Sequence, residues 1–105
     1  MNDDRWISLF LDAQAAEFGA SQNTLLAYGR DLLDASSWLE QNQLSFETAI
    51  KESLENYLMY CADQGLAKST RARRLSALKQ IYNFAFQEGW IDSNPATVMD
   101  LVEEL

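Results

Sequence analysis

Histidine is absent from the 105 residues, and cysteine and proline occur once each. Histidine is the commonest general base and metal ligand in proteins, and one cysteine cannot complete a zinc set or an internal disulfide. The sequence therefore predicts no metal site, no cofactor and no disulfide. The single thiol, Cys61, lies in an apolar helical stretch with no basic residue flanking it, and we interpret it as a core residue.

Long hydrophobic runs are also missing. No apolar run approaches the roughly 20 residues that span a bilayer. The N-terminus, with Asp3 and Asp4 ahead of Trp6, lacks the basic start of a signal peptide. We therefore expect a cytoplasmic protein with no membrane partner. A composition that is 48% hydrophobic and 23% charged is typical of one folded domain. A chain of this size is too small for a core plus an enclosed active-site cleft, which disfavours an enzyme acting alone.

Strand signals are missing as well, because no stretch alternates apolar and polar residues for long. Apolar residues instead recur at steps of three and four, which is the helical spacing. The pattern predicts an all-α protein, a compact bundle of four helices with a short C-terminal helical tail. The predicted helices span about 3–18, 21–41, 48–64 and 69–88, and the tail about 96–105.

The ends of the predicted helices have local signals. Gly19, Gly65 and Gly89 stand where a left-handed residue ends a helix, and Trp90 or Ile91 is expected to fold back on the last long helix. Short polar side chains are expected as N-caps, because they accept a hydrogen bond from the first turn. The predicted N-caps are Asp3 or Asp4, Ser21, Thr48 in preference to Ser45, and Ser69.

Charge is distributed unevenly. The net charge is −8, from 16 acidic and 8 basic residues, and a protein of that charge repels phosphate at long range. Between Gln64 and Gln87, however, there is no Asp or Glu. Five basic residues fall in this window, so that it carries +5 and the remainder −13: Lys68, Arg71, Arg73, Arg74 and Lys79.

Polar residues that recur at steps of four, three and four share one side of the predicted 69–88 helix and include no carboxylate. Arginine can fork onto guanine or phosphate, glutamine can pair with adenine, and serine and lysine can bind phosphate. This face predicts a helix that binds nucleic acid. Its residues are Ser69, Arg73, Ser76 and Gln80, bordered by Lys79 and Asn83, and the opposite, core-facing side has Leu75, Leu78, Ile81, Tyr82 and Ala85.

Other interpretations of the same residues stay open. The polar face is also what the solvated side of an amphipathic helix looks like. Arg71 and Arg74 point to the margin of the apolar stripe, where aliphatic stems covering the core are as expected as phosphate contacts. A rival function is an α-helical protein-interaction module, whose basic face docks on an acidic partner or on another copy of the chain.

Three sequence blocks resemble a known family. They are the segment from Asn23 to Leu32, the segment from Ser69 to Lys79, and Gly89-Trp90-Ile91 with Asn94-Pro95-Ala96. In this order they resemble the N-terminal core-binding, or SAM-like, domain of tyrosine recombinases and phage integrases, closest to the Xer branch. Gly29 stands where the Xer pattern usually has an arginine.

The resemblance implies an orthogonal four-helix bundle that forms one half of a clamp around duplex DNA, with the second and fourth helices approaching the DNA. It implies that residues 1–95 form this domain and that residues 96–105 begin a tail toward an absent catalytic domain, so the chain itself is not an enzyme. The implied partners are duplex DNA and other recombinase protomers, with the isolated domain a monomer. The implied DNA-binding residues are Asn23, Thr24, Arg30, Lys68, Ser69, Thr70, Arg73, Ser76, Lys79 and Gln80, with Tyr28 supporting the packing.

The nucleic-acid interpretation makes one demand on the fold. Arg73, Ser76 and Lys79 must face outward and must not be buried against acidic groups of the protein itself.

Overall fold

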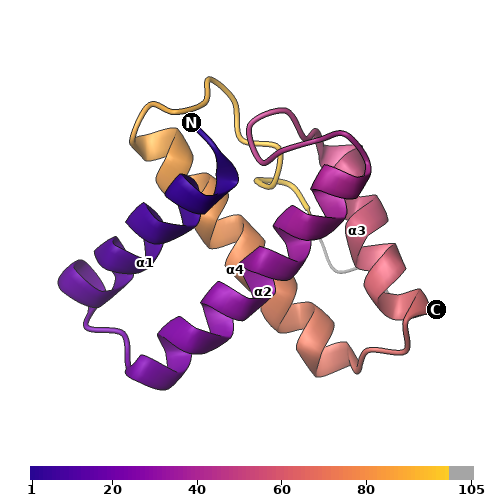
Figure 1. Cartoon of the computed structure of the whole chain (residues 1–105), viewed down its shortest axis with the longest axis horizontal. Helices are drawn as coiled ribbons and strands as arrows, with labels where there is room; N and C mark the ends of the chain where they lie inside the picture. Colours follow the sequence, from indigo (N-terminus) through magenta and orange to yellow (C-terminus); the bar gives the residue numbers. More distant parts are fainter. Residues whose placement is uncertain (100–105) are drawn as a thin grey trace.

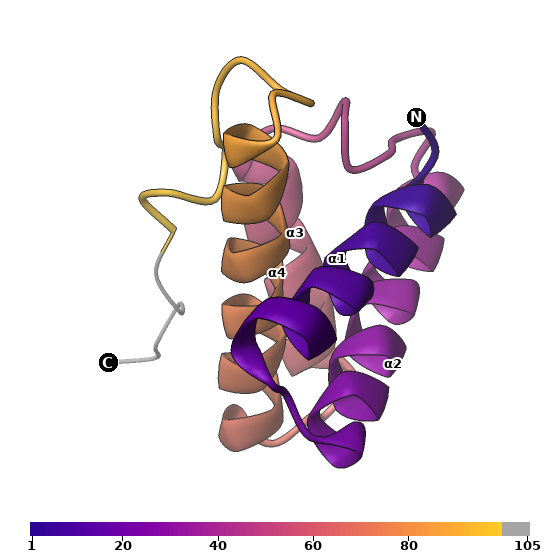
Figure 2. The ribbon, with the colours of Figure 1, turned by 90° about the vertical axis from the view of Figure 1, so that its left-hand side faces the viewer.

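Four helices make up the protein in the computed structural model, which describes residues 1–99: α1 (Asp3–Phe18), α2 (Gln22–Gln41), α3 (Lys51–Asp63) and α4 (Lys68–Gln87). No strand occurs in this part of the chain, which confirms the all-α prediction. α2 packs against each of the other three helices and crosses α4 near the middle of both (Figure 1). Seen from the side, α4 stands on the left and α2 on the right, with α1 in front between them and α3 behind (Figure 2).

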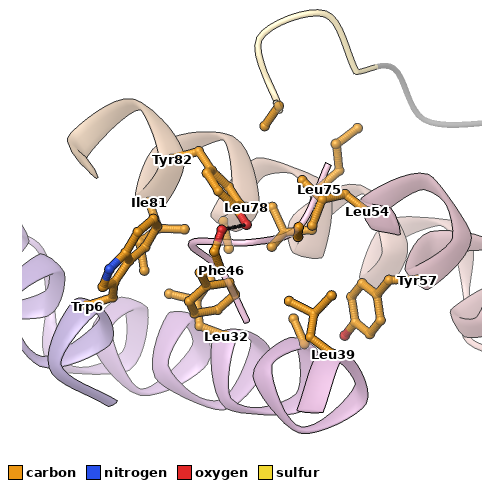
Figure 3. Close-up of a cluster of buried hydrophobic side chains, with 14 of the residues drawn as sticks. Trp6, Leu32, Leu39, Phe46, Leu54, Tyr57, Leu75, Leu78, Ile81 and Tyr82 are labelled. Atoms are coloured by element: carbon orange, nitrogen blue, oxygen red, sulfur yellow. Dashed lines mark hydrogen bonds between the residues drawn. The ribbon is translucent and has the colours of Figure 1, made fainter. Parts of the chain in front are cut away.

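The core lies where the four helices and the 42–50 loop converge (Figure 3). Trp6 is its largest side chain and contacts Phe46, Tyr82 and Trp90, with ring centroids 5.4 to 5.6 Å apart. The core-facing side predicted for the 69–88 helix is buried as expected. Fully buried residues of the whole core include Phe10, Leu32, Leu39, Leu54, Leu78 and Ile81.

Glycine ends three of the helices, as the sequence predicts. Gly89 has φ +80°, a left-handed conformation that turns the chain back after α4. The backbone N–H of Trp90 then donates to the carbonyl of Ala85 at 2.9 Å. The Trp90 ring folds back onto Phe84, with ring centroids 5.2 Å apart. This turn fixes the C-terminal end of α4 against the core.

One of the predicted N-caps is confirmed and the one expected for α1 is wrong. Ser21 caps α2, because its hydroxyl accepts from the backbone N–H of Thr24. The N-cap of α1 is Asn2 and neither Asp3 nor Asp4. The Asp3 carboxylate accepts instead from the Phe46 backbone N–H at 2.9 Å and from the Ser36 hydroxyl at 2.7 Å. It therefore ties α1 to α2 and to the 42–50 loop.

The predicted N-cap of α3 is wrong for a similar reason. Thr48 and Ser45 bond each other in a turn, with the backbone N–H of Ser45 donating to Thr48 Oγ1 at 2.8 Å and that of Thr48 donating to Ser45 Oγ at 3.3 Å. Neither hydroxyl is left to cap a helix. α3 begins only at Lys51, and the Ser53 hydroxyl accepts from the backbone N–H of Ile50.

Ser69 is not the N-cap of α4 either, because the helix begins one residue before it. Gly65, with φ +83°, reverses the chain directly after α3. The backbone N–H of Leu66 bonds the Cys61 carbonyl at 3.2 Å, which brings Leu66 to the edge of the core. The chain is then already in position for α4, whose N-cap is Ala67 and has no side-chain hydrogen bond. Ser69 lies exposed in the first turn.

The segment after α4 packs on the core without forming the predicted helix. Residues 95–98 form a turn, and Ala96 and Met99 are buried. The prediction of a helical tail is therefore wrong for residues 96–99, and its remainder, residues 100–105, lies outside the described residues. The domain boundary after residue 95 stays a prediction, although the buried core includes Met99. No helix within residues 1–99 is long and apolar enough to cross a membrane.

Candidate nucleic-acid interface

The outward side of α4 and the adjoining half of α2 hold all of the sequence-predicted DNA-binding residues. Every one of them is at least partly exposed. They do not form one bonded cluster, because Asn23 and Thr24 lie in the first turn of α2, where the Thr24 hydroxyl accepts from Ser21. The exposed residues are Asn23, Arg30, Lys68, Ser69, Arg73 and Ser76, and the half-buried ones are Thr24, Thr70, Lys79 and Gln80.

Arg73 forms a two-pronged ion pair across the helix crossing. Its Nε donates to Asp31 Oδ2 at 2.7 Å and its Nη2 donates to Asp31 Oδ1 at 2.9 Å. The Asp31 side chain is 1% exposed, whereas that of Arg73 stays 44% exposed. The hydrogen bonds that Arg73 donates to Asp31, followed by the negative charge of Asp31, raise the pKa of Arg73 above the usual arginine value. The pair therefore fixes the guanidinium at the surface of the α2–α4 crossing.

This pairing corrects the picture of an unopposed positive strip. The sequence suggested that no carboxylate meets the outward face of α4, but Asp31 reaches it from α2 and balances the charge of Arg73. The requirement that Arg73, Ser76 and Lys79 face outward without acidic partners is therefore met only in part. Ser76 remains exposed, and within residues 1–99 Lys79 has no ion pair or side-chain hydrogen bond. An arginine has five N–H donors, so Arg73 keeps three of them for another partner.

Arg74 belongs to the structure of the bundle and not to its outer face. Its side chain is 14% exposed, and its Nη1 donates to Asp34 Oδ2 at 2.5 Å and to the Tyr57 hydroxyl at 2.9 Å. The Tyr57 hydroxyl in turn donates to Asp34 at 2.6 Å. Burial, and then the hydrogen bond to Asp34, raise the pKa of Tyr57 above its usual range. This network joins α2, α3 and α4.

The single cysteine is a core residue, as predicted, but its neighbourhood is not free of positive charge. Cys61 is fully buried on α3. No basic residue flanks it in the sequence, yet Nη1 of Arg74 lies 3.7 Å from its Sγ. Arg71 likewise has a structural contact, since its Nε donates to the Leu66 carbonyl at 3.3 Å in the turn between α3 and α4.

Gln80 joins α4 to α2 at the outer surface of the crossing. Its Nε2 donates to the hydroxyl of Tyr28 at 2.9 Å and to Oγ of Ser76 at 3.1 Å. The Tyr28 ring packs against Phe10, with ring centroids 6.3 Å apart. Tyr28 therefore supports the packing, as expected, and also holds a polar side chain of the outer face in place.

A hollow of about 330 Å³ adjoins the same face of α4. Within the part of the chain that the structure describes, no carboxylate lines it, and its polar residues offer one ammonium, three amides and one hydroxyl. Two of them, Asn94 and Thr97, come from the turn after α4 and were not predicted as site residues, because only the folded tail brings them to this face. The hollow is lined by Lys79, Gln80, Asn83, Asn94, Ala96 and Thr97.

Sequence reasoning also missed Asp31 as a member of the site, although a signal was present. Asp31 stands three residues after Tyr28 and beside Leu32, on the apolar stripe of α2. A carboxylate on a buried stripe needs a cationic or hydrogen-bonding partner, since an unpaired buried charge is very costly. The cation-rich 64–87 window was the available source of that partner. Which arginine it would be depends on how α2 and α4 cross.

Comparison with known proteins bears on this arrangement. A family model described as the phage integrase N-terminal SAM-like domain matches residues 7–89. The chain belongs to this family. The resemblance seen in the three sequence blocks is thus confirmed, and the four helices described above are those of a SAM-like domain.

Relatives of this SAM-like domain are similar over nearly all of it. The tyrosine recombinase XerD of Rhizobium meliloti is 41% identical over 95 residues, which is 90% of this chain and 30% of that protein. The XerD of Caulobacter vibrioides is 39% identical over 93 residues, and that of Vibrio vulnificus is 30% identical over 99 residues. The chain therefore spans about 30% of the length of the curated relatives it matches.

Proposed function

We propose that this domain binds duplex DNA as the N-terminal part of a Xer-type tyrosine recombinase, positioning the recombinase on its site during strand exchange. The observation that carries the proposal is the accessible face at the α2–α4 crossing, which presents cations, amides and hydroxyls. Among residues 1–99, the one carboxylate that reaches this face, Asp31, is buried beneath Arg73. Family membership supports the same function, because the relatives it matches are named tyrosine recombinases.

Phosphate contacts supply most of the affinity in this proposal. Arg30 on α2 and Lys79 on α4 have no ion pair or side-chain hydrogen bond within the described part of the chain, so their full charge is available to phosphate. The N-terminus of α4 adds a second kind of site. Its first turn has no side-chain cap, which leaves backbone N–H groups near Ser69 and Thr70 for a phosphate oxygen.

Arg73 has a different part. Because Asp31 balances its charge, it adds little to long-range attraction, but its orientation is fixed before DNA arrives. A side chain that is already ordered loses less conformational entropy on binding. Arg73 therefore suits short-range contact to a phosphate or base edge through the donors that Asp31 leaves unused, whereas Arg30 and Lys79 provide the salt-sensitive attraction.

A fluorescence titration of a labelled 20-base-pair duplex with the 105-residue chain tests the proposal. We expect weak binding at low salt with a log–log salt slope of about −2 to −4, as for two to four phosphate contacts. Lys79→Ala together with Arg30→Ala should flatten the slope by about 2. The matched control is Lys51→Ala, which removes a lysine of α3 that pairs with Glu55.

Two results would contradict this function. One is the absence of any duplex binding at low salt by the folded chain. The other is an equal loss of binding in the control and in the Arg30 and Lys79 variants. The rival interaction module is separated by sedimentation of the same variants, because a self-association that disappears with Lys79→Ala, without any DNA binding to lose, would favour it.

A further inference from the structure

In the side-chain amide of Gln80, the nitrogen has hydrogen-bond partners inside the protein, whereas the oxygen has none among the described residues. A primary amide carries two N–H donors on nitrogen and an acceptor on oxygen. Nε2 donates to Tyr28 and to Ser76, which uses both hydrogens inside the protein. Oε1 has no partner among the described residues. Gln80 also lines the hollow beside Lys79, so that a ligand on this face can reach its side chain.

The orientation of the amide matters because base pairs differ in the hydrogen-bond donors and acceptors that they present in the major groove. Adenine presents the N6 amino donor beside the N7 acceptor, and cytosine presents the N4 amino donor. Guanine and thymine present acceptors at O6, N7 and O4. Glutamine usually pairs with adenine through both amide atoms, one donating and one accepting. A glutamine with both donors already engaged can only accept.

We propose that Gln80 is a specificity-determining residue that accepts a hydrogen bond through Oε1 from the exocyclic amino group of adenine or cytosine, with its amide held in this orientation by Tyr28 and Ser76. The inference rests on the proposed DNA binding. It departs from the usual two-atom pairing of glutamine with adenine, because that pairing needs an N–H that Gln80 already donates inside the protein.

The two residues that hold the Gln80 amide, Tyr28 and Ser76, are themselves held in place by the fold. Tyr28 is half-buried, and its ring lies against Phe10, so its hydroxyl is fixed relative to α4. Ser76 lies one turn before Gln80 on α4 itself. Tyr28 and Ser76 are therefore positioning residues, and Gln80 is the residue that meets the base. The reversed amide would turn two N–H groups to the DNA and would select guanine or thymine, so the two orientations predict opposite preferences.

Selection from a duplex library with a randomised 10-base-pair centre, followed by sequencing, measures the preference. With the wild-type chain we expect one position that admits adenine and cytosine and disfavours guanine and thymine by about fivefold, the effect of roughly 1 kcal/mol. Gln80→Ala should abolish this preference. Gln87→Ala should not, and it is the matched control, because Gln87 is an exposed glutamine at the end of the same helix.

Tyr28→Phe gives the sharper test. Loss of the hydroxyl frees one N–H of Gln80, so adenine can then be bound by two hydrogen bonds and should rise about fivefold over cytosine. Tyr60→Phe, on the exposed side of α3, is the control. At the selected position, 7-deazaadenine should bind the wild-type chain as adenine does and should bind Tyr28→Phe less well, because only the variant uses N7.

The outcomes separate the two proposals. A wild-type preference for guanine or thymine that depends on Gln80, or a loss of wild-type affinity with 7-deazaadenine, overturns the amide orientation while DNA binding stands. Duplex binding that Gln80→Ala leaves unchanged in affinity and preference overturns the role of Gln80. Absence of any duplex binding overturns the proposed function and this inference together.

Discussion

Arg73 and Arg74 are neighbours in the sequence, and both lie within reach of Asp31, yet they belong to two different regions of the molecule. The Arg73 side chain is 44% exposed at the outer surface of the α2–α4 crossing, whereas that of Arg74 is 14% exposed between α2, α3 and α4. Arg74 has Asp34 and Tyr57 as further partners, and Arg73 has none of these. The difference shows that burial and the number of partners, not residue type, decide which arginine holds the fold and which remains available to a ligand.

The largest expected effect is on stability and follows from breaking the inner region, the network of Arg74, Asp34 and Tyr57. Arg74→Ala leaves Asp34 and Tyr57 without their cation and opens space beside Cys61. Removing one partner of a buried ion pair typically costs about 3–5 kcal/mol. Because the Asp34 side chain is 46% exposed and Asp31 keeps Arg73, we expect about 2 kcal/mol. Urea unfolding followed by circular dichroism measures this. Arg73→Ala should cost less, because Arg74 Nε still lies 3.5 Å from the Asp31 carboxylate, and equal costs would contradict the distinction between the two regions.

A smaller effect is expected at alkaline pH. Burial raises the pKa of both Tyr57 and Tyr82 above the ordinary value of 10.0. In the unfolded chain these tyrosines ionise near pH 10, and in the folded chain they do so only at higher pH. Their contribution is thus fully present below pH 10 and is lost as the pH rises above it. The loss should be about 1 kcal/mol per buried tyrosine between pH 10 and 11.

Single substitutions test whether Tyr57 causes part of this loss of stability at alkaline pH. Tyr57→Phe should lower stability at pH 8, because a hydroxyl bonded to Asp34 and Arg74 is removed. It should also make the unfolding free energy fall less steeply above pH 10. Tyr60→Phe is the matched control, since Tyr60 is an exposed tyrosine on the same helix, and its curve should follow the wild type. A Tyr57→Phe curve as steep as the wild type would refute the assignment.

The smallest effect concerns the outer region, the Asp31–Arg73 pair, and is measured as the salt dependence of DNA binding. Asp31→Asn removes the carboxylate that balances Arg73, so that Arg73 becomes available as one more phosphate contact. We expect the log–log salt slope to steepen by about 1. Asp34→Asn changes the net charge equally but leaves the Asp31–Arg73 pair in place, so its slope should stay near the wild type. Equal slopes in the two variants would indicate a general charge effect only.

Local signals explain how much of the fold was predictable. The cap at Ser21 depends on a residue three positions away, and the turn at Gly89 depends on the adjoining helix, so both are visible in the sequence. The cap expected from Asp3 failed because Phe46, 43 residues further along the chain, takes the carboxylate. The predicted helix over 96–99 failed because burial of Ala96 and Met99 outweighs a weak local preference.

The candidate site likewise has features that local sequence predicts and features that depend on contacts between distant residues. Periodicity placed Ser69, Arg73 and Ser76 on one exposed side of α4, because side-chain direction within a helix follows from spacing alone. The pairing of Arg73 with Asp31 and of Gln80 with Tyr28 depends on how α2 and α4 cross, because the paired residues lie 42 and 52 positions apart in the sequence. No local pattern fixes that crossing, so the sequence overestimated the positive charge of the face.

The most direct test of the central claim is a two-dimensional ¹H–¹⁵N NMR titration of the labelled chain with an unlabelled 20-base-pair duplex at low salt. We predict that amide shifts concentrate in the first turn of α4, at Ser76 to Gln80, and near Arg30 on α2, while α1 and α3 stay unchanged. Shifts confined to α1 and α3, or none at all at saturating duplex, would contradict the account.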